Sequence, residues 1–202
     1  MPAAPLEPHR QRQVAESFGT DAARYDRTRP RYPTALVERI VAASPGPDLL
    51  DVGTGTGIAA RQLEAAGAQV LGVDPDARMA EVARQFGVPV EVATFEDWDP
   101  AGRAFDAVVA TQAWHWVDAV AGAAKAARVL RPGGRLVVFW NAGQPSPAAA
   151  AAFAAVTARV VPELPALPPD RPVLAAYDTM CDTAADGMAK AGFGEPDRWR
   201  FD

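Results

Sequence analysis

Residues 49–76, LLDVGTGTGIAARQLEAAGAQVLGVDPD, constrain the fold of this chain more than any other stretch. They open with the apolar run LLDV, typical of a strand buried in a parallel sheet, and three glycines at alternate positions follow. The segment IAARQLEAA then predicts a helix, and the run VLGV predicts a second strand that ends at Asp74. This order predicts an α/β fold, a Rossmann-like, doubly wound, mostly parallel sheet with helices on both faces.

The same stretch predicts a nucleoside pocket at the carboxyl ends of the first two strands. Gly53, Gly55 and Gly57 let the backbone approach a ligand closely. Asp74 follows the loop by about 20 residues, where an acid can bind ribose hydroxyls. Ile58 stands where the dinucleotide fingerprint requires a glycine, and the G-K-[ST] of a phosphate-binding loop is absent from the sequence. The alternative is a tight turn without a ligand.

The runs DVGTGTG and GVDPD resemble the first two motifs of class I S-adenosylmethionine-dependent methyltransferases of the small-molecule, type 11-like kind. The run RVLRPGGRLVVFW resembles the strand-five signature of the same family. The resemblance implies S-adenosylmethionine as cofactor, with its methionine part over the glycine loop and its ribose on the acid after the second strand. The cofactor-binding residues that it implies are Asp51, Gly53, Thr54, Gly55, Gly57, Asp74, Pro75, Thr94, Phe95, Glu96 and Gln112.

Residues 94–96 follow the third predicted strand, where the family lines the adenine with a side chain and a backbone N–H. Family members often carry Asp-Ala-Glu there, whereas this chain carries Thr94, Phe95 and Glu96. Threonine is a weaker anchor than a carboxylate for the adenine edge. Ordinary core packing is the alternative role for Phe95.

The segment TQAWHWVD, residues 111–118, resembles the family's loop after strand four, beside the reactive methyl group. Gln112 is expected near the cofactor, and Trp114 and Trp116 are expected to line the substrate pocket. His115 is the candidate general base, because a histidine near neutrality can accept a proton from an attacking hydroxyl. The alternatives are that His115 contacts the substrate or is structural, and that the two tryptophans fill the core.

Residues 1–44 predict a helical cap, with helices over 14–25 and 34–43 joined by a loop. The cap resembles the segment that covers the cofactor in many small-molecule methyltransferases. The resemblance makes Phe18, Tyr25, Arg29 and Tyr32 candidates to close over the cofactor or to contact its carboxylate, and Tyr25 is also a candidate substrate contact. The alternative is that the tyrosines only pack the cap and that the arginines are solvated.

The remaining chain predicts one domain over 1–202, with a cofactor-binding core over 45–143 and a helical substrate-side segment over 144–202. Phe153, Val156 and Val160 are the expected anchors of a helix over 148–161. Further predicted elements are helices over 77–85, 118–130 and 173–191, strands over 88–92, 105–110 and 135–140, a turn over 131–134, a loop over 162–172 and the opening of a strand over 198–202. The family's sheet normally ends with an antiparallel strand pair, here incomplete. The chain is therefore either shortened, or a partner such as a second copy in a homodimer covers the open edge.

Charge and composition narrow the functional classes. The net charge of −5 and the lack of a basic tract disfavour a nucleic-acid substrate. A single cysteine, Cys181, predicts neither a disulfide nor a metal cluster. No stretch resembles a secretory signal or a membrane span, so we expect a soluble, cytoplasmic protein. The richness in Ala, Arg and Pro is typical of GC-rich bacterial genomes.

The functional hypothesis is methyl transfer from S-adenosylmethionine to a small or medium-sized acceptor. One alternative is a non-catalytic S-adenosylmethionine-binding or interaction protein. A less favoured one is an NAD(P)-dependent oxidoreductase, which Ile58 and the absence of a Tyr-x-x-x-Lys pair argue against.

Overall fold

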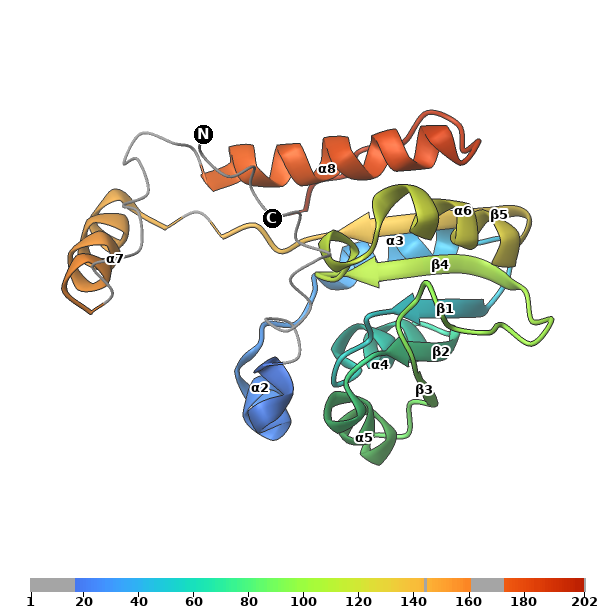
Figure 1. Ribbon diagram of the computed structural model, residues 1–202, viewed down its shortest axis with the longest axis horizontal. Coiled ribbons are helices and arrows are strands. Elements are labelled where there is room, and N and C mark those ends of the chain that lie inside the picture. Colours follow the sequence, from blue (N-terminus) through green and yellow to red (C-terminus); the bar gives the residue numbers. More distant parts are fainter. Residues whose placement is uncertain (1–16, 144, 161–172, 202) are drawn as a thin grey trace.

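The computed structural model describes residues 17–143, 145–160 and 173–201. Within these residues, five parallel strands form one sheet in the order β3-β2-β1-β4-β5 (Figure 1). The strands are β1 Asp48–Val52, β2 Gln69–Asp74, β3 Val90–Val92, β4 Phe105–Thr111 and β5 Leu130–Phe139. The predicted α/β class with a parallel, Rossmann-like sheet is confirmed.

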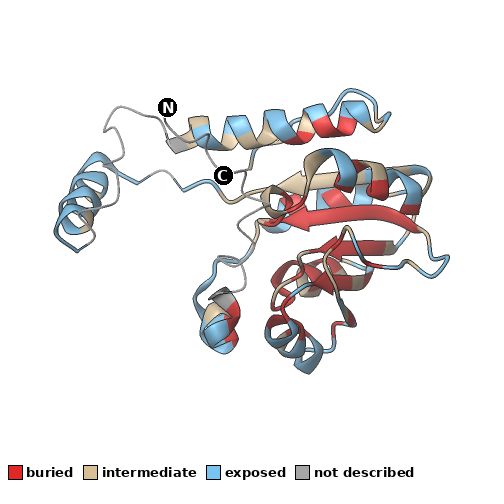
Figure 2. Cartoon of the chain, in the orientation of Figure 1, coloured by how far each residue is buried: buried red, intermediate tan, exposed pale blue. Residues whose placement is uncertain are grey.

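Successive residues of a strand point to opposite faces of the sheet, and this builds two hydrophobic cores. Leu49 lies in the core that α3 (Thr34–Ala43), α4 (Ile58–Ala65) and α5 (Ala77–Gln85) cover. Leu50 lies in the opposite core, under α6 (Ala119–Val129) and α8 (Val173–Lys190). Both leucines are fully buried, and Figure 2 shows the central strands buried along their length. Burial on both faces explains why the strands are continuous apolar runs.

Two predicted helices match the structure residue for residue. The helix over 34–43 is α3, whose Leu36, Val37 and Ile40 are buried, as its amphipathic pattern predicts. The helix over 77–85 is α5, which begins after Asp76 because that side chain accepts a hydrogen bond from the Arg78 N–H at 2.9 Å.

The cap differs from its prediction. The first residues of the helix predicted over 14–25 lie outside the described residues, and the remainder divides into a 3-10 turn, η2 (Ser17–Asp21), and α2 (Ala22–Thr28). Asp21 starts the new helix by accepting a hydrogen bond from the Arg24 N–H at 3.0 Å. The loop predicted from Tyr25 onward therefore begins only after Thr28.

The turn predicted over 131–134 is a bulge within β5. Phe105 pairs with Leu130 and Ala107 pairs with Arg135, so four residues of β5 lie opposite one residue of β4. Gly133 takes the positive φ of +80° that this irregularity requires. The proline and glycines that predicted a turn therefore form the bulge, and the chain stays in the sheet.

Two predictions in the C-terminal quarter are wrong. The helix α7 (Pro147–Val160) exists, but its expected anchors are exposed, Phe153 to 74%, and Figure 1 shows it apart from the sheet. No strand begins at residue 198: residues 194–201 have no regular structure, and Trp199 packs against the core that α3 covers. The loop predicted over 162–172 lies outside the described residues. Among the described residues, no helix combines the length and apolarity needed to cross a membrane.

Candidate functional site

A cavity opens at the carboxyl ends of β1, β2 and β4, where the sequence predicts a ligand. Twelve of the predicted site residues line it, whereas Arg29, Asp51, Gly57, Trp114 and His115 are not among its lining residues. The lining residues that the sequence predicted are Tyr25, Tyr32, Gly53, Thr54, Gly55, Asp74, Pro75, Thr94, Phe95, Glu96, Gln112 and Trp116. Thr56, Asp76 and Met79 also line the cavity, without having been predicted.

The glycine loop is shaped by close approach of its neighbours. Gly53 has a φ of +67°, and its N–H donates to the Val73 carbonyl at 2.8 Å. A Cβ at Gly53 would lie 2.4 Å from the Cβ of Ala113, which belongs to the loop after β4. Gly57 instead begins α4 with a φ of +79°, and a Cβ there would lie 3.2 Å from the Cβ of Ala83 on α5. Gly53 therefore shapes the cavity wall, whereas Gly57 lets α4 pack on α5.

Asp74 connects the glycine loop to the strand that ends beside it. One carboxylate oxygen accepts the Gly55 N–H at 2.8 Å, and the other accepts the Asp76 N–H at 2.9 Å. A carboxylate oxygen can accept two hydrogen bonds, so each retains capacity for one more donor. Burial raises the pKa of Asp74 to about 6. The ionised Asp74 carboxylate can therefore accept hydrogen bonds from a pair of hydroxyl groups in the cavity.

Asp51 lies beneath the loop rather than on the cavity. It is fully buried, and its Oδ2 accepts the Thr54 hydroxyl at 2.7 Å. Its Oδ1 has no hydrogen-bond partner among the described residues. Burial raises the pKa of Asp51 to about 7.

The raised pKa of Asp74 predicts that the free energy of unfolding falls, and the affinity for a ligand rises, as pH increases. The folded chain holds the Asp74 proton up to about pH 6, against an ordinary value of 3.8. The folded state therefore binds more protons than the unfolded state between these values, and ionising Asp74 lowers the free energy of unfolding as pH rises. A hydroxyl-bearing ligand prefers the ionised carboxylate, so its affinity should rise over the same range.

The comparison that isolates this effect is urea unfolding of the wild type and Asp74→Asn at pH 4.5 and 7.5. The lowered pKa of His115 acts in the opposite direction and the raised pKa of Asp51 in the same direction, and both groups are present in both proteins. We expect the wild type to lose stability relative to the variant as pH rises. A constant difference between the two proteins would contradict the prediction.

The loop after β3 carries the three residues expected at the adenine. Phe95 lines the cavity and is also 3% exposed in the core, stacked on Trp98 at 6.5 Å between centroids, so both of its proposed roles are compatible with its position. The Thr94 hydroxyl donates to Asp97 at 2.7 Å. Glu96 accepts the Asp118 N–H at 3.0 Å through Oε1. The loop is thus bonded both within itself and to the start of α6.

The segment after β4 divides between cavity and core. Trp116 lines the cavity, whereas Trp114 is 2% exposed and packs on Phe95 at 6.3 Å, a position that favours its core-packing alternative. The His115 ring contacts the Trp116 ring, with 4.6 Å between centroids. The Trp140 indole N–H donates to His115 Nδ1 at 3.1 Å. Neutral His115 therefore carries its own proton on Nε2.

The cap is fixed to α4 by polar contacts that sequence reasoning missed. Asp26 is buried and accepts the Thr56 hydroxyl at 2.9 Å, and it pairs with Arg61 of α4. Gln62 also exchanges two hydrogen bonds with the Tyr32 backbone, at 3.0 and 2.9 Å. The one available signal was an acid alone among arginines in RYDRTRPR. These contacts hold the cap segment whose Tyr25 and Tyr32 line the cavity.

Replacing Asp26 by alanine should release the cap, because it removes the carboxylate that accepts hydrogen bonds from a guanidinium N–H of Arg61 and from the Thr56 hydroxyl. Removing one partner of a buried ion pair costs about 3–5 kcal/mol, and the 80% buried Arg61 side chain places this pair near the lower limit. Hydrogen–deuterium exchange over residues 22–28 should accelerate far more than exchange in β1. Asp21→Ala, which removes the exposed N-cap of the same helix but keeps its contact with α4, is the comparison variant and should accelerate this exchange less. Equal exchange in both variants would contradict the role of Asp26.

The amino-acid sequence of this chain is similar to that of known methyltransferases. Residues 50–138 match a family described as a methyltransferase domain. An uncharacterized methyltransferase of Mycobacterium tuberculosis is 40% identical over 133 residues, which are 64% of this chain and 54% of that protein. A demethylmenaquinone methyltransferase of Mycobacterium sp. (strain JLS) is 34% identical over 134 residues, which are 62% of this chain and 58% of that protein.

Among solved structures, a proposed type II methyltransferase from Anaeromyxobacter dehalogenans matches with a TM-score of 0.54 and 31% identity. The match covers 65% of this chain and 59% of that one. The chain thus spans a little over half the length of the curated relatives and of this structure.

Proposed function

Starting from the class I S-adenosylmethionine-dependent methyltransferase domain that residues 50–138 form, we propose that this protein transfers the methyl group of S-adenosylmethionine to a small or medium-sized acceptor. The observation that carries the proposal is Asp74, held by the Gly55 and Asp76 N–H groups at the end of β2 with acceptor capacity left on both oxygens. A carboxylate so placed suits the two hydroxyl groups of a ribose.

The lining residues support a complete cofactor site. Asp74 would hold the ribose, residues 94–96 would flank the adenine, and the backbone at Gly53 and Gly55 would lie against the methionine part. Gln112, whose φ of +57° is rare for a residue with a side chain, would contact the cofactor from the loop after β4. Asp51 would act indirectly, by holding Thr54.

When bound, S-adenosylmethionine supplies a methyl group already activated by the sulfonium charge. The remaining work of the chain is to orient the acceptor in line with the methyl group and to exclude water. Tyr25, Tyr32 and Trp116 are placed to do this at the mouth of the cavity. We therefore propose that the methyl acceptor binds between the cap and the loop after β4, and that the ribose of the cofactor binds at the end of β2.

An acceptor that must lose a proton requires a base, and His115 is the candidate that the proposal names. Its Nδ1 lone pair is engaged by the Trp140 indole. A proton could reach Nδ1 only after that contact opens, so the geometry favours His115 as a hydrogen-bond donor through Nε2.

The proposal extends to several coarser properties of the protein. We propose a single domain over 1–202, with the cap over 1–44, the core over 45–143 and a substrate-side segment over 144–202. We further propose a cytoplasmic protein that acts on small molecules rather than nucleic acid. The edge of the sheet at β5 supports a homodimer or another partner at that edge, because an open edge strand offers unpaired backbone groups.

Isothermal titration with S-adenosylhomocysteine and with NADH tests the proposal against its rivals. Binding of the former alone supports a methyltransferase, whereas binding of NADH alone would favour the oxidoreductase. Transfer of tritium from methyl-labelled S-adenosylmethionine to small-molecule acceptors, absent in Asp74→Asn, then tests catalysis. Tight cofactor binding with no transfer across a broad acceptor panel would favour the non-catalytic alternative.

A further inference from the structure

We propose that Lys125 fixes the shape of the adenine loop, defined here as residues 94–98, and so sets the preference of the site for adenine over other purines. Lys125 is then a positioning residue, because it acts through the loop rather than on the ligand. This inference rests on the proposed function, since it assumes that the cavity holds an adenosyl group.

The side chain of Lys125 reaches the adenine loop from α6. Lys125 is only 8% exposed, and its Nζ donates to the Glu96 carbonyl at 2.9 Å and to the Trp98 carbonyl. Residues 94–98 form one helical turn, in which the Trp98 N–H donates to the Thr94 carbonyl at 2.9 Å. The two acceptors of Lys125 are carbonyls in the last three residues of this turn. One ammonium group therefore holds both carbonyls at the carboxyl end of this turn.

The ammonium group also lies near the rings of the loop. Its Nζ is 5.7 Å from the centroid of Phe95 and 5.8 Å from that of Trp98, which permits cation–π attraction to both. Burial lowers the pKa of Lys125, which shows that the charge is held at a cost in solvation. The carbonyl and ring contacts offset that cost only while the loop keeps this shape.

A second contact joins the same helix to the same loop. Asp118 starts α6 by accepting hydrogen bonds from the Val120 and Ala121 N–H groups, and its own N–H donates to Glu96 at 3.0 Å. The adenine loop is therefore attached to α6 at Asp118 and again at Lys125. Of these two attachments, only Lys125 contacts the backbone on both sides of Asp97.

The position of this turn decides what the cavity presents to a purine. Thr94, Phe95 and Glu96 line the cavity, so their side chains and backbone N–H groups occupy the proposed adenine side. Without the ammonium group, the buried Trp98 carbonyl and the part-buried Glu96 carbonyl lose this donor, which favours a movement of the turn toward water. Such a movement should weaken the hydrogen bonds that read the purine edge more than the contacts of the ribose at Asp74.

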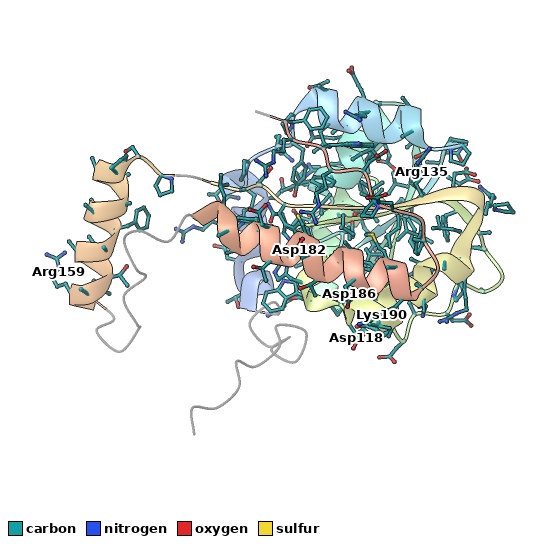
Figure 3. The ribbon with its side chains drawn as sticks, turned by 90° about the horizontal axis from the view of Figure 1, so that it is seen from above. Asp118, Arg135, Arg159, Asp182, Asp186 and Lys190 are labelled. Atoms are coloured by element: carbon teal, nitrogen blue, oxygen red, sulfur yellow. The ribbon has the colours of Figure 1, made fainter. Side chains whose placement is uncertain are left out.

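The test compares Lys125→Met with Lys190→Met, because these are the only two lysines in the sequence. Methionine keeps the apolar stem of the side chain and removes the donor. Lys190 pairs with Asp186 on the exposed surface of α8, at 2.6 Å (Figure 3). Titration with S-adenosylhomocysteine and with S-inosylhomocysteine, in which the hydrogen-bonding pattern of the purine edge is altered, measures the discrimination.

We expect Lys125→Met to bind S-adenosylhomocysteine about tenfold more weakly than the wild type, with roughly a threefold or greater fall in discrimination against the inosyl analogue. Lys190→Met should match the wild type in both measurements. A lower melting temperature with unchanged discrimination would show a merely structural role and overturn the inference. No binding of either ligand by the wild type would instead contradict the proposed function itself.

A measurement on the wild-type protein guards against a variant that fails to fold. Lysine labelled with carbon-13 at Cε gives one signal for each of the two lysines. Addition of S-adenosylhomocysteine should shift the Lys125 signal and leave the Lys190 signal in place. Binding that moves neither signal would overturn the inference.

Discussion

Replacing Asp74 by asparagine is expected to weaken the binding of S-adenosylhomocysteine by about a hundredfold, since two hydrogen bonds to a charged group are each worth about 1.5–3 kcal/mol. Asparagine has nearly the same shape but offers one acceptor oxygen where aspartate offers two. In the folded chain both aspartate oxygens already accept a backbone N–H, from Gly55 and from Asp76. The amide therefore cannot satisfy the loop and a ribose at the same time.

The matched control for this substitution is Glu81→Gln. Glu81 is an exposed carboxylate on α5 whose contact with Arg84, at 3.9 Å, is a weak surface pair. Isothermal titration should give this variant the affinity of the wild type. Equal affinities of Asp74→Asn and Glu81→Gln for S-adenosylhomocysteine would remove Asp74 from the site and, with it, the observation that carries the proposed function.

Replacing Gly53 by alanine should lower the free energy of unfolding by about 3 kcal/mol, which sums a positive-φ cost of 1–2 kcal/mol and an overpacking cost of 1–3 kcal/mol. The φ of +67° is unfavourable for alanine. In addition, the new Cβ would lie 2.4 Å from the Cβ of Ala113, so the loop after β4 has to move. Since that loop carries Gln112 and Trp116, the binding of S-adenosylhomocysteine should weaken as well.

Gly102→Ala separates these two costs. Gly102 has a similar φ of +76°, but a Cβ there would meet no atom within 4 Å. This variant should lose only the conformational cost and should keep the affinity of the wild type. Urea unfolding and titration of both variants provide the measurement. Equal destabilisation of the two variants would show that the contact between Gly53 and Ala113 does not shape the loop.

Elements whose hydrophobic pattern repeats locally could be predicted from the sequence. The helices over 34–43 and 77–85 have a clear apolar face and, in the second, a capping acid, and both match the structure. The glycine loop and Asp74 were found because their spacing alone implies a strand, a turn and a second strand. Most of the predicted cofactor residues accordingly line one cavity.

Features that depend on contacts distant in sequence could not be predicted in this way. Asp26 meets Arg61 across 35 residues, and Lys125 meets the Glu96 carbonyl across 29 residues. Nothing local in either sequence segment marks these residues as buried. Similarly, the apolar positions of α7 match a buried face, but a pattern does not show whether a partner element is present. The positions of these residues and of α7 therefore depend on tertiary contacts, which local sequence patterns do not reveal.

A crystal structure of the complex with S-adenosylhomocysteine tests the central claim most directly. The account predicts the ligand in the cavity at the ends of β1, β2 and β4, with both ribose hydroxyls donating to Asp74 and the purine beside residues 94–96. A ligand bound elsewhere, or bound in this cavity with its ribose turned away from Asp74, would contradict the account.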